Sequence, residues 1–308
     1  MVVRANLSMM HGKDFKTQVG TGTHTGVTLQ DGSAFTATKE VVLSAGTLQS
    51  PTLLVSLGIG SSSLLRAASI DVVVDLFNVG ENLQDHLHIQ NPYQLKPNYT
   101  SFDNLRYNTS FASSQLASWN ASQRSMYDYA GSGYALLNWT QVLGANSTTY
   151  AQLTTLARKT LLSSNKFINS YKLDYVINKA YSAQVPQLEV IFSDGYTGMK
   201  GYPPTNSSLY GANFFTLIAA TQHPFSLGSI HINASDPNGK PVFHPNYLDF
   251  EYDRLALRTA AQYLRKIANK LPLRDVWTAE YEPGPNVQSD EDWDAFVRDT
   301  ALNIYHPV

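Results

Sequence analysis

The sequence predicts an α+β fold, and three observations lead to this prediction. An apolar run at 41–43 passes through a glycine into a helical pattern that ends near residue 60, which is the order of elements in an α/β unit. Two long strand patterns follow at 186–195 and 212–236. Amphipathic helices then occupy 253–271 and 289–303. We therefore expect part of an α/β domain first, and then an antiparallel β-sheet with flanking helices.

Turn residues predict the first strands. Residues 20–44 have the pattern of a hairpin and a further strand, because Asp31 and Gly32 form a strong hairpin signal between alternating apolar positions. The run at 41–43 is all apolar, which is typical of a strand buried on both faces. A further strand is predicted at 72–76, followed by a loop that contains glycine.

Capping residues predict the helix that follows the first apolar run. Ser50 is expected to be the N-cap, and Pro51 stands at the first helical position, where a missing N–H has no cost. Gly58 and Gly60 are expected to end the helix.

The later elements follow from composition and periodicity. Residues 97–150 are rich in Ser, Asn and Tyr and are expected to be exposed, like an insertion, whereas residues 151–181 have helical spacing. Pro224 and Gly228 interrupt the second long strand pattern. In the helix at 253–271, one face is expected to consist of Leu255, Ala256, Leu264, Ile267 and Leu271. Ser289 is the expected N-cap of the last helix.

Composition excludes several classes of protein. The chain has 308 residues, of which 43% are hydrophobic and 15% charged, so it can form one large core or two smaller ones. The net charge of −2 gives no basic surface for nucleic acid. No apolar run reaches the roughly 18 residues of a spanning helix. Because there are no cysteines, disulfides and thiolate metal sites are excluded.

N-glycosylation sequons indicate a secreted, extracellular glycoprotein. They lie at Asn6, Asn98, Asn108, Asn120, Asn138, Asn146, Asn206 and Asn233. The alternative is a polar, Ser-rich chain with accidental sequons. Since the first residues lack the charged and apolar regions of a signal peptide, secretion would require sequence before Met1.

Two motifs could carry chemistry. The strand–glycine–helix unit lets the backbone approach a flat ligand closely at Gly46, although an ordinary βα turn has the same pattern. The loop at 78–86 is dense in groups that can form hydrogen bonds with the backbone. His86 and His88 lie two residues apart with no third ligand nearby, so we predict no metal site.

Together these stretches resemble the glucose–methanol–choline (GMC) flavin oxidoreductases, with fungal glucose oxidase and aryl-alcohol oxidase as the nearest kinds. "GTLQSPTLLVSLGIG" is similar to a family signature, with Leu57 where serine is usual. "NVGENLQDH" matches the next landmark completely. "HPFSLGSIHINASDP" and "PVFHPNYLD" resemble the substrate-domain segment, with Leu227 where arginine is common. "YHPV" resembles the start of the active-site motif, which normally continues with Gly-Thr.

The resemblance implies an organisation into three parts. Residues 1–90 would be the C-terminal part of an FAD-binding α/β domain. Residues 91–300 would be mainly a substrate-binding domain with an antiparallel sheet and flanking helices. Residues 301–308 would start the return of the active site to the flavin domain.

The resemblance also implies a reaction and a set of site residues. The reaction is oxidation of the CH–OH group of a primary alcohol or a sugar, with FAD as cofactor and oxygen or a quinone as electron acceptor. His306 would be the base that accepts the hydroxyl proton. The residues expected near the flavin are Ala45, Gly46, Thr47, Asn82 and Tyr305.

Two family features have no counterpart in the sequence. Family members begin with a G-x-G-x-x-G turn that binds the pyrophosphate of FAD, and the glycines of this chain form no such run. Members also continue past the active-site histidine to a second His or Asn. We therefore expect an incomplete member whose isolated chain neither retains FAD nor turns over substrate. Two alternatives stay open, a catalytically inactive secreted glycoprotein domain and a non-redox lyase or cyclase on the same scaffold.

Overall fold

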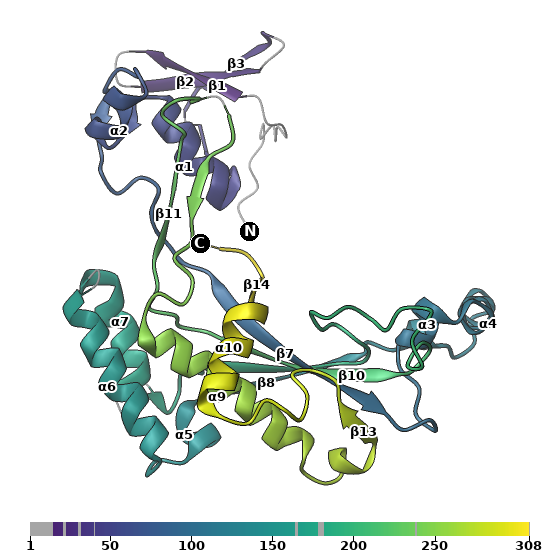
Figure 1. The fold of residues 1–308 in the computed structure, drawn as a ribbon. Helices are drawn as coiled ribbons and strands as arrows, with labels where there is room; N and C mark the ends of the chain where they lie inside the picture. The colour runs from purple at the N-terminus through teal and green to yellow at the C-terminus, as the bar shows by residue number, and fades with distance from the viewer. Residues whose placement is uncertain are drawn as a thin grey trace. The chain divides into compact units, whose positions relative to one another are not determined.

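The computed structural model describes residues 15–20, 23–29, 32–39, 41–163, 166–177, 182–237 and 239–307 (Figure 1). The chain divides into two compact units. Unit 1 contains Met1–Leu83, Leu227–Pro245 and Val308, and unit 2 contains Gln84–Ser226 and Asn246–Pro307. Within the described ranges, no helix combines the length and the hydrophobicity needed to cross a membrane.

Unit 1 consists of short elements in small sheets. Its elements are β1 (Phe15–Gly20), β2 (Thr23–Leu29), β3 (Ala34–Thr36), α1 (Gly46–Ser56), β4 (Ile59–Gly60), α2 (Ser62–Ala67), β5 (Val74–Asp75), β6 (Glu81–Leu83), β11 (Gly228–His231) and β12 (Val242–His244). The sheets have the orders β1-β2-β3, β12-β11-β6 and β4-β5. Its buried apolar cluster consists of Val55, Leu65, Ala68, Val79 and Ile232.

The predicted hairpin is confirmed, because β2 and β3 pair antiparallel with Val27 opposite Phe35. Asp31 lies outside the described residues. The predicted strand at 41–43 is wrong, since these residues form no strand and Val42 is 62% exposed. Apolar side chains alone do not make a strand; its backbone groups also need a partner, and no described strand pairs with 41–43. The strand predicted at 72–76 is reduced to β5, which pairs in parallel with β4.

The predicted start of the first helix is also wrong. The helix α1 begins at Gly46, and its N-cap position is Ala45. Ser50 lies inside the helix, where its Oγ accepts a hydrogen bond from the Ala45 N–H at 3.1 Å. The predicted end is confirmed: Gly58 follows the helix with a φ of +79°, and a Cβ there would lie 2.3 Å from the Asp71 oxygen.

Unit 2 is larger and contains the main sheet. Its elements are β7 (His86–Leu95), α3 (Asp103–Tyr107), α4 (Thr109–Asn120), η1 (Met126–Asp128), β8 (Ser132–Leu137), α5 (Trp139–Leu143), α6 (Thr148–Ser163), α7 (Lys166–Ile177), β9 (Leu188–Ser193), β10 (Phe214–Thr221), α9 (Glu251–Ala268), η2 (Leu273–Asp275), β13 (Trp277–Glu280), α10 (Asp290–Thr300) and β14 (Leu302–Ile304).

The six-stranded sheet has the order β13-β7-β10-β9-β8, and β14 also pairs with β7. Every pair of described strands in this sheet is antiparallel, which confirms the predicted antiparallel sheet with flanking helices. One face of the sheet and the helices beside it form one apolar cluster, which includes Ile89, Leu217, Val190, Leu257 and Trp293.

The two amphipathic helices form as predicted. In α10, the Ser289 Oγ accepts from the Asp292 N–H at 3.1 Å, and the Asp292 carboxylate accepts from the Ser289 N–H at 3.0 Å. In α9, the predicted face is correct for Leu255, Ala256 and Leu264, which are buried, and for Ile267, which packs against them. Leu271 is the exception: it lies beyond the end of the helix and is 72% exposed.

Residues 97–150 are only partly the exposed insertion that their composition predicts. The helix α4 buries no residue. In contrast, β8 forms the edge of the main sheet, and Trp139 is 1% exposed with its Nε1 donating to the Tyr252 hydroxyl at 3.2 Å. The polar composition of residues 97–150 therefore did not predict that α5 contributes Trp139 to the core.

A buried carboxylate fixes the segment that joins β10 to β11. Asp253, in the first turn of α9, accepts hydrogen bonds from the N–H groups of Phe225 at 2.8 Å and Ser226 at 2.7 Å. Lys172 lies nearby and donates from its Nζ to the Pro224 oxygen at 2.6 Å. Burial lowers the pKa of Lys172 to about 8, and the charge of Asp253 opposes that shift.

Candidate active-site face

The tyrosine and histidine of the "YHPV" motif follow directly after β14. Strand β14 pairs antiparallel with the first half of β7, with Leu302 opposite His88 and Ile304 opposite His86 (Figure 1). Tyr305 has a φ of +64°, a left-handed conformation that is rare for a bulky residue. His306 is exposed. The motif therefore emerges from the main sheet through a strained residue.

The register of the sheet places several polar residues on one face. Residues directly opposite each other in antiparallel strands point to the same side. Leu302, His88, Ala220, Glu189 and Leu136 therefore form one row across β14, β7, β10, β9 and β8.

The helices pack against the other face of the sheet. Ile89 and Val190 point there, and the Asn91 Nδ2 donates to the Ala261 oxygen of α9. We call the side opposite the helices the polar face and define it by His86, His88, Gln90, Glu189 and Tyr305. It combines two histidines and a carboxylate with the start of the active-site motif.

Hydrogen bonds connect Tyr305 to the strand β9. The Tyr305 hydroxyl donates to the Glu189 Oε1 at 2.9 Å, and the Gln222 Nε2 donates to the Glu189 Oε2 at 3.2 Å. The Tyr305 ring meets the His86 ring edge to face, with 6.4 Å between the ring centroids. Desolvation, and then the hydrogen bond and negative charge of Glu189, raise the pKa of Tyr305 to about 12. Tyr305 is therefore a hydrogen-bond donor at neutral pH.

Two histidines of unit 2 are held in their neutral form. Burial lowers the pKa of His88, whose Nε2 lies 2.8 Å from the Gln90 Nε2. With the Gln90 amide donating, the His88 Nε2 is the acceptor. Burial, and then the charge of His86, lower the pKa of His223 to about 4. Neither histidine carries a positive charge at pH 7.

The other predicted cofactor residues belong to unit 1. Ala45, Gly46 and Thr47 form the start of α1, which has no side-chain cap and no acidic residue in its first turn. A Cβ on Gly46 would meet no atom within 4 Å, so a flat group has room to approach this backbone. The positive end of the helix dipole suits an electron-rich or anionic edge. These residues fit part of a flavin site.

Asn82 lies in the loop that matches the family landmark, and its φ is +62°. The preceding Gly80 has a φ of +86°, and a Cβ there would lie 2.1 Å from the Ile230 oxygen. The Ile230 N–H also donates to the Gly80 oxygen at 2.7 Å. This loop needs glycine because it lies directly against β11, and that contact fixes the backbone of Asn82.

Sequence reasoning missed Glu189 and Gln222. Glu189 lies in a long strand pattern that contains no motif and is 8% exposed, and Gln222 lies directly before the segment that begins at His223. The available signal was a single acidic residue inside the apolar run "LEVIF". The pattern around Asp85 was recognised, but its partner was not: Asp85 accepts a hydrogen bond from the Tyr247 hydroxyl.

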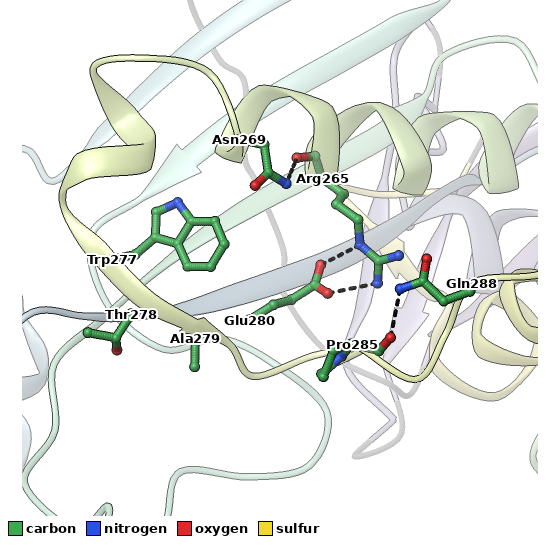
Figure 2. Close-up of a pocket in the computed structure, with 8 residues that line it drawn as sticks. All are labelled: Arg265, Asn269, Trp277, Thr278, Ala279, Glu280, Pro285 and Gln288. Atoms are coloured by element: carbon green, nitrogen blue, oxygen red, sulfur yellow. Dashed lines mark hydrogen bonds and ion pairs between the residues drawn. The ribbon is translucent and has the colours of Figure 1, made fainter.

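A pocket of about 360 Å³ lies elsewhere in unit 2 (Figure 2). Its lining consists of Arg265, Asn269, Trp277, Thr278, Ala279, Glu280, Pro285 and Gln288. Figure 2 shows the Arg265 guanidinium directed at Glu280, with contacts of 2.9 and 2.7 Å. The pocket borders β13, which pairs with the end of β7 opposite to β14. It lies roughly 20 Å along the strand from the motif, at about 3.3 Å per residue, and its charges are already paired.

The sequon asparagines differ in exposure. Asn6 lies outside the described residues. The exposed ones are Asn98, Asn108, Asn120, Asn146, Asn206 and Asn233. Asn138 is buried: its Oδ1 caps α5 by accepting from the Gln141 N–H at 2.9 Å, and its Nδ2 donates to the Ala183 oxygen at 3.1 Å. The folded chain therefore disfavours a glycan at Asn138.

Comparison with known families identifies the chain. Two family models described as GMC oxidoreductase match residues 4–88 and 224–308. The first stretch contains Ala45, Gly46, Thr47 and Asn82, and the second contains Tyr305 and His306. The chain belongs to the GMC oxidoreductase family. The predicted family is thereby confirmed, and the cofactor that the sequence predicts, FAD, is that of the family.

Curated relatives from the GMC family align along most of the chain. The GMC oxidoreductase family protein Mala s 12 of Malassezia sympodialis is 29% identical, across 99% of this chain and 47% of its own length. Alcohol oxidase 2 of Komagataella phaffii is 28% identical, across 77% of this chain and 32% of its own length. The chain spans about half the length of the first of these relatives.

Solved structures share the fold. An FAD-dependent oxidoreductase from Chaetomium thermophilum has a TM-score of 0.76 at 22% identity and covers 93% of this chain and 48% of its own. A fungal aryl-alcohol oxidase has a TM-score of 0.70 at 24% identity and covers 92% and 47%. At these identities the likeness supports the fold alone.

Proposed function

We propose that the protein oxidises the CH–OH group of a primary alcohol or a sugar, with FAD as the cofactor. Membership of the GMC oxidoreductase family supports a flavin oxidoreductase, and the alcohol oxidase relative supports alcohol oxidation. Because this chain spans about half the length of the first relative, the activity is proposed for the whole protein. Oxygen or a quinone is the electron acceptor.

The single observation that carries the proposal is the placement of the motif on the polar face. Strand β14 is paired with β7, and the next residues are the anchored Tyr305 and the exposed His306. In this proposal the His306 imidazole accepts the proton of the substrate hydroxyl. Histidine is the side chain that most often acts as a general base in enzymes.

FAD, when bound, supplies the acceptor for the hydride that leaves the substrate carbon. The residues that we propose to lie against it are Ala45, Gly46 and Thr47 at the start of α1, together with Asn82 and Tyr305. The free space at Gly46 and the position of all three at the N-terminal end of α1 support the first three. The neutral histidine His88 adds no positive charge to the polar face.

The role of His306 can be tested in the whole protein by the rate at which substrate bleaches the flavin without oxygen. We expect His306→Ala to retain flavin and to slow this step by about 10²–10⁴-fold, which is the usual contribution of a general base. The control is His244→Ala, which removes another exposed histidine. A bleaching rate within about threefold of wild type would exclude His306 as the base. A flavin that stays bound but is never bleached by alcohols or sugars would favour a non-redox lyase or cyclase.

We further propose that the protein is a secreted, extracellular glycoprotein. The exposure of six sequon asparagines, from Asn98 to Asn233, supports this proposal. When the protein is produced in a secretory host, mass spectrometry of its peptides should find glycans at exposed asparagines such as Asn120 and Asn206, and none at Asn138. Unmodified peptides at all exposed sequons would contradict secretion through this route, and a glycan on Asn138 would contradict its buried capping role.

A further inference from the structure

Tyr305 has a strained backbone, and its side chain forms a hydrogen bond with a residue far away in sequence. Its left-handed φ of +64° is unfavourable for an aromatic residue, so surrounding contacts have to hold it. The Tyr305 hydroxyl reaches the Glu189 Oε1 on β9 at 2.9 Å, a contact between residues far apart in sequence. The residue directly after this one is His306. The direction in which the His306 backbone leaves the sheet is therefore set by the conformation of Tyr305.

Glu189 is itself held in place. It is buried within the row Leu302, His88, Ala220 and Leu136 on the polar face, and its second oxygen accepts from the Gln222 Nε2 at 3.2 Å. A carboxylate fixed by one partner can act as a rigid acceptor for the other, and hydrogen bonds to a charged group are stronger than neutral ones. The raised pKa of Tyr305 agrees with a phenol that keeps its proton in this contact.

The hydrogen bond to Glu189 is the contact that fixes the position of the Tyr305 hydroxyl. The edge-to-face contact with His86 orients the ring but does not fix the position of the hydroxyl. The ring is 54% exposed, so packing alone does not immobilise it. Without the bond to Glu189, the side chain could leave the sheet, and the backbone could relax to a negative φ.

We infer that Glu189, through its hydrogen bond to the Tyr305 hydroxyl, is a positioning residue that fixes the orientation of His306. The inference rests on the proposed function only in so far as the orientation of His306 affects a reaction rate. Its structural content, that Glu189 and Tyr305 control His306, can be tested without turnover.

The experiment compares four variants of the whole, flavin-containing protein. Tyr305→Phe removes only the hydroxyl, Glu189→Ala removes the acceptor, and Glu189→Gln keeps an acceptor oxygen while it removes the charge. Tyr127→Phe is the matched control, since Tyr127 is 44% exposed and its hydroxyl has no hydrogen bond among the described residues. The readouts are the ¹³C NMR signal of the His306 ring, assigned with His306→Ala, and the anaerobic rate of flavin bleaching per bound flavin.

We expect Tyr305→Phe and Glu189→Ala to shift the His306 signal and to lower the bleaching rate by about 10- to 100-fold, because small misplacements of a reacting group cost rates of this size. Substrate affinity should change little. Glu189→Gln should restore most of the rate, and Tyr127→Phe should match wild type. A role in stability alone would lower flavin content or Tm while the rate per bound flavin stayed constant.

The outcomes separate the two proposals. An unchanged His306 signal in both Tyr305→Phe and Glu189→Ala overturns the inference, whatever the rates are. A shifted signal combined with a His306→Ala variant of normal rate upholds the positioning and overturns the proposed function. If His306→Ala is slow but the rates of both positioning variants stay within about twofold of wild type, the function holds and the inference fails.

Discussion

Units 1 and 2 contain similar kinds of apolar residue but bury them to different extents. In unit 1, buried residues such as Val55 and Leu65 form a small cluster, and apolar side chains stay exposed at Val42, Val72, Val73, Val74, Leu76 and Phe77. In unit 2, the sheet and its helices share one continuous core. An apolar run therefore specifies a buried strand only where the fold also supplies pairing and packing partners.

The two units also differ in their buried polar groups. In unit 2, Asp253 is 5% exposed and holds the N–H groups of Phe225 and Ser226, and Lys172 lies close to it. In unit 1, the contact between the Glu81 Oε1 and the His231 Nε2, at 2.8 Å, is partly exposed. Buried charges make large contributions when one partner is removed, whereas exposed pairs contribute little. Unit 2 should therefore be the more sensitive to a single polar substitution.

The largest expected effect follows from this contrast. Asp253→Ala leaves two buried N–H groups without an acceptor and Lys172 without its carboxylate, so we expect a loss of about 3–5 kcal/mol in the free energy of unfolding. Urea denaturation followed by tryptophan fluorescence measures it. The control Asp275→Ala changes an exposed residue and should cost less than about 0.5 kcal/mol. Equal, small losses in both variants would show that the Asp253 network does not stabilise unit 2.

Local signals predicted unit 2 better than unit 1. The signals for the capping box at Ser289 and for the apolar face of α9 each lie within a single helix, and both features formed as expected. Leu271 failed because the helix ends at Ala268, and periodicity does not mark that end. In unit 1, the outcome at 41–43 depended on partners distant in sequence, which a short apolar window does not contain.

The candidate site also contains residues that local motifs predict and residues that depend on partners distant in sequence. Gly46, Asn82 and His306 were found because they stand in recognisable motifs, and Gly46 and Asn82 have positive φ angles that such motifs often require. Glu189 was missed because its role comes from sheet register, which places it across from Ala220 and His88. The composition of residues 97–150 also failed to predict the burial of Trp139, since a single buried tryptophan hardly changes the average polarity of the segment.

The smallest expected effect is at the apolar run 41–43. It is the most direct test of the difference in burial between the two units. Val42 is 62% exposed and lies outside any strand, whereas Val190 is 7% exposed in the centre of β9. We expect Val42→Ser to change the free energy of unfolding by less than about 0.5 kcal/mol, as for other exposed positions. The matched Val190→Ser should cost at least about 2 kcal/mol, because it removes buried apolar area and leaves a hydroxyl in the core.

Both variants can be measured by urea denaturation, with hydrogen exchange at 41–43 as a second readout. Exchange there should be fast in wild type, because no described strand accepts or donates to these backbone groups. Slow exchange together with a Val42→Ser cost close to that of Val190→Ser would mean that the run is a paired, buried strand after all. The difference between the two units would then lie in the size of their cores alone, and the sequence-based prediction at 41–43 would be restored.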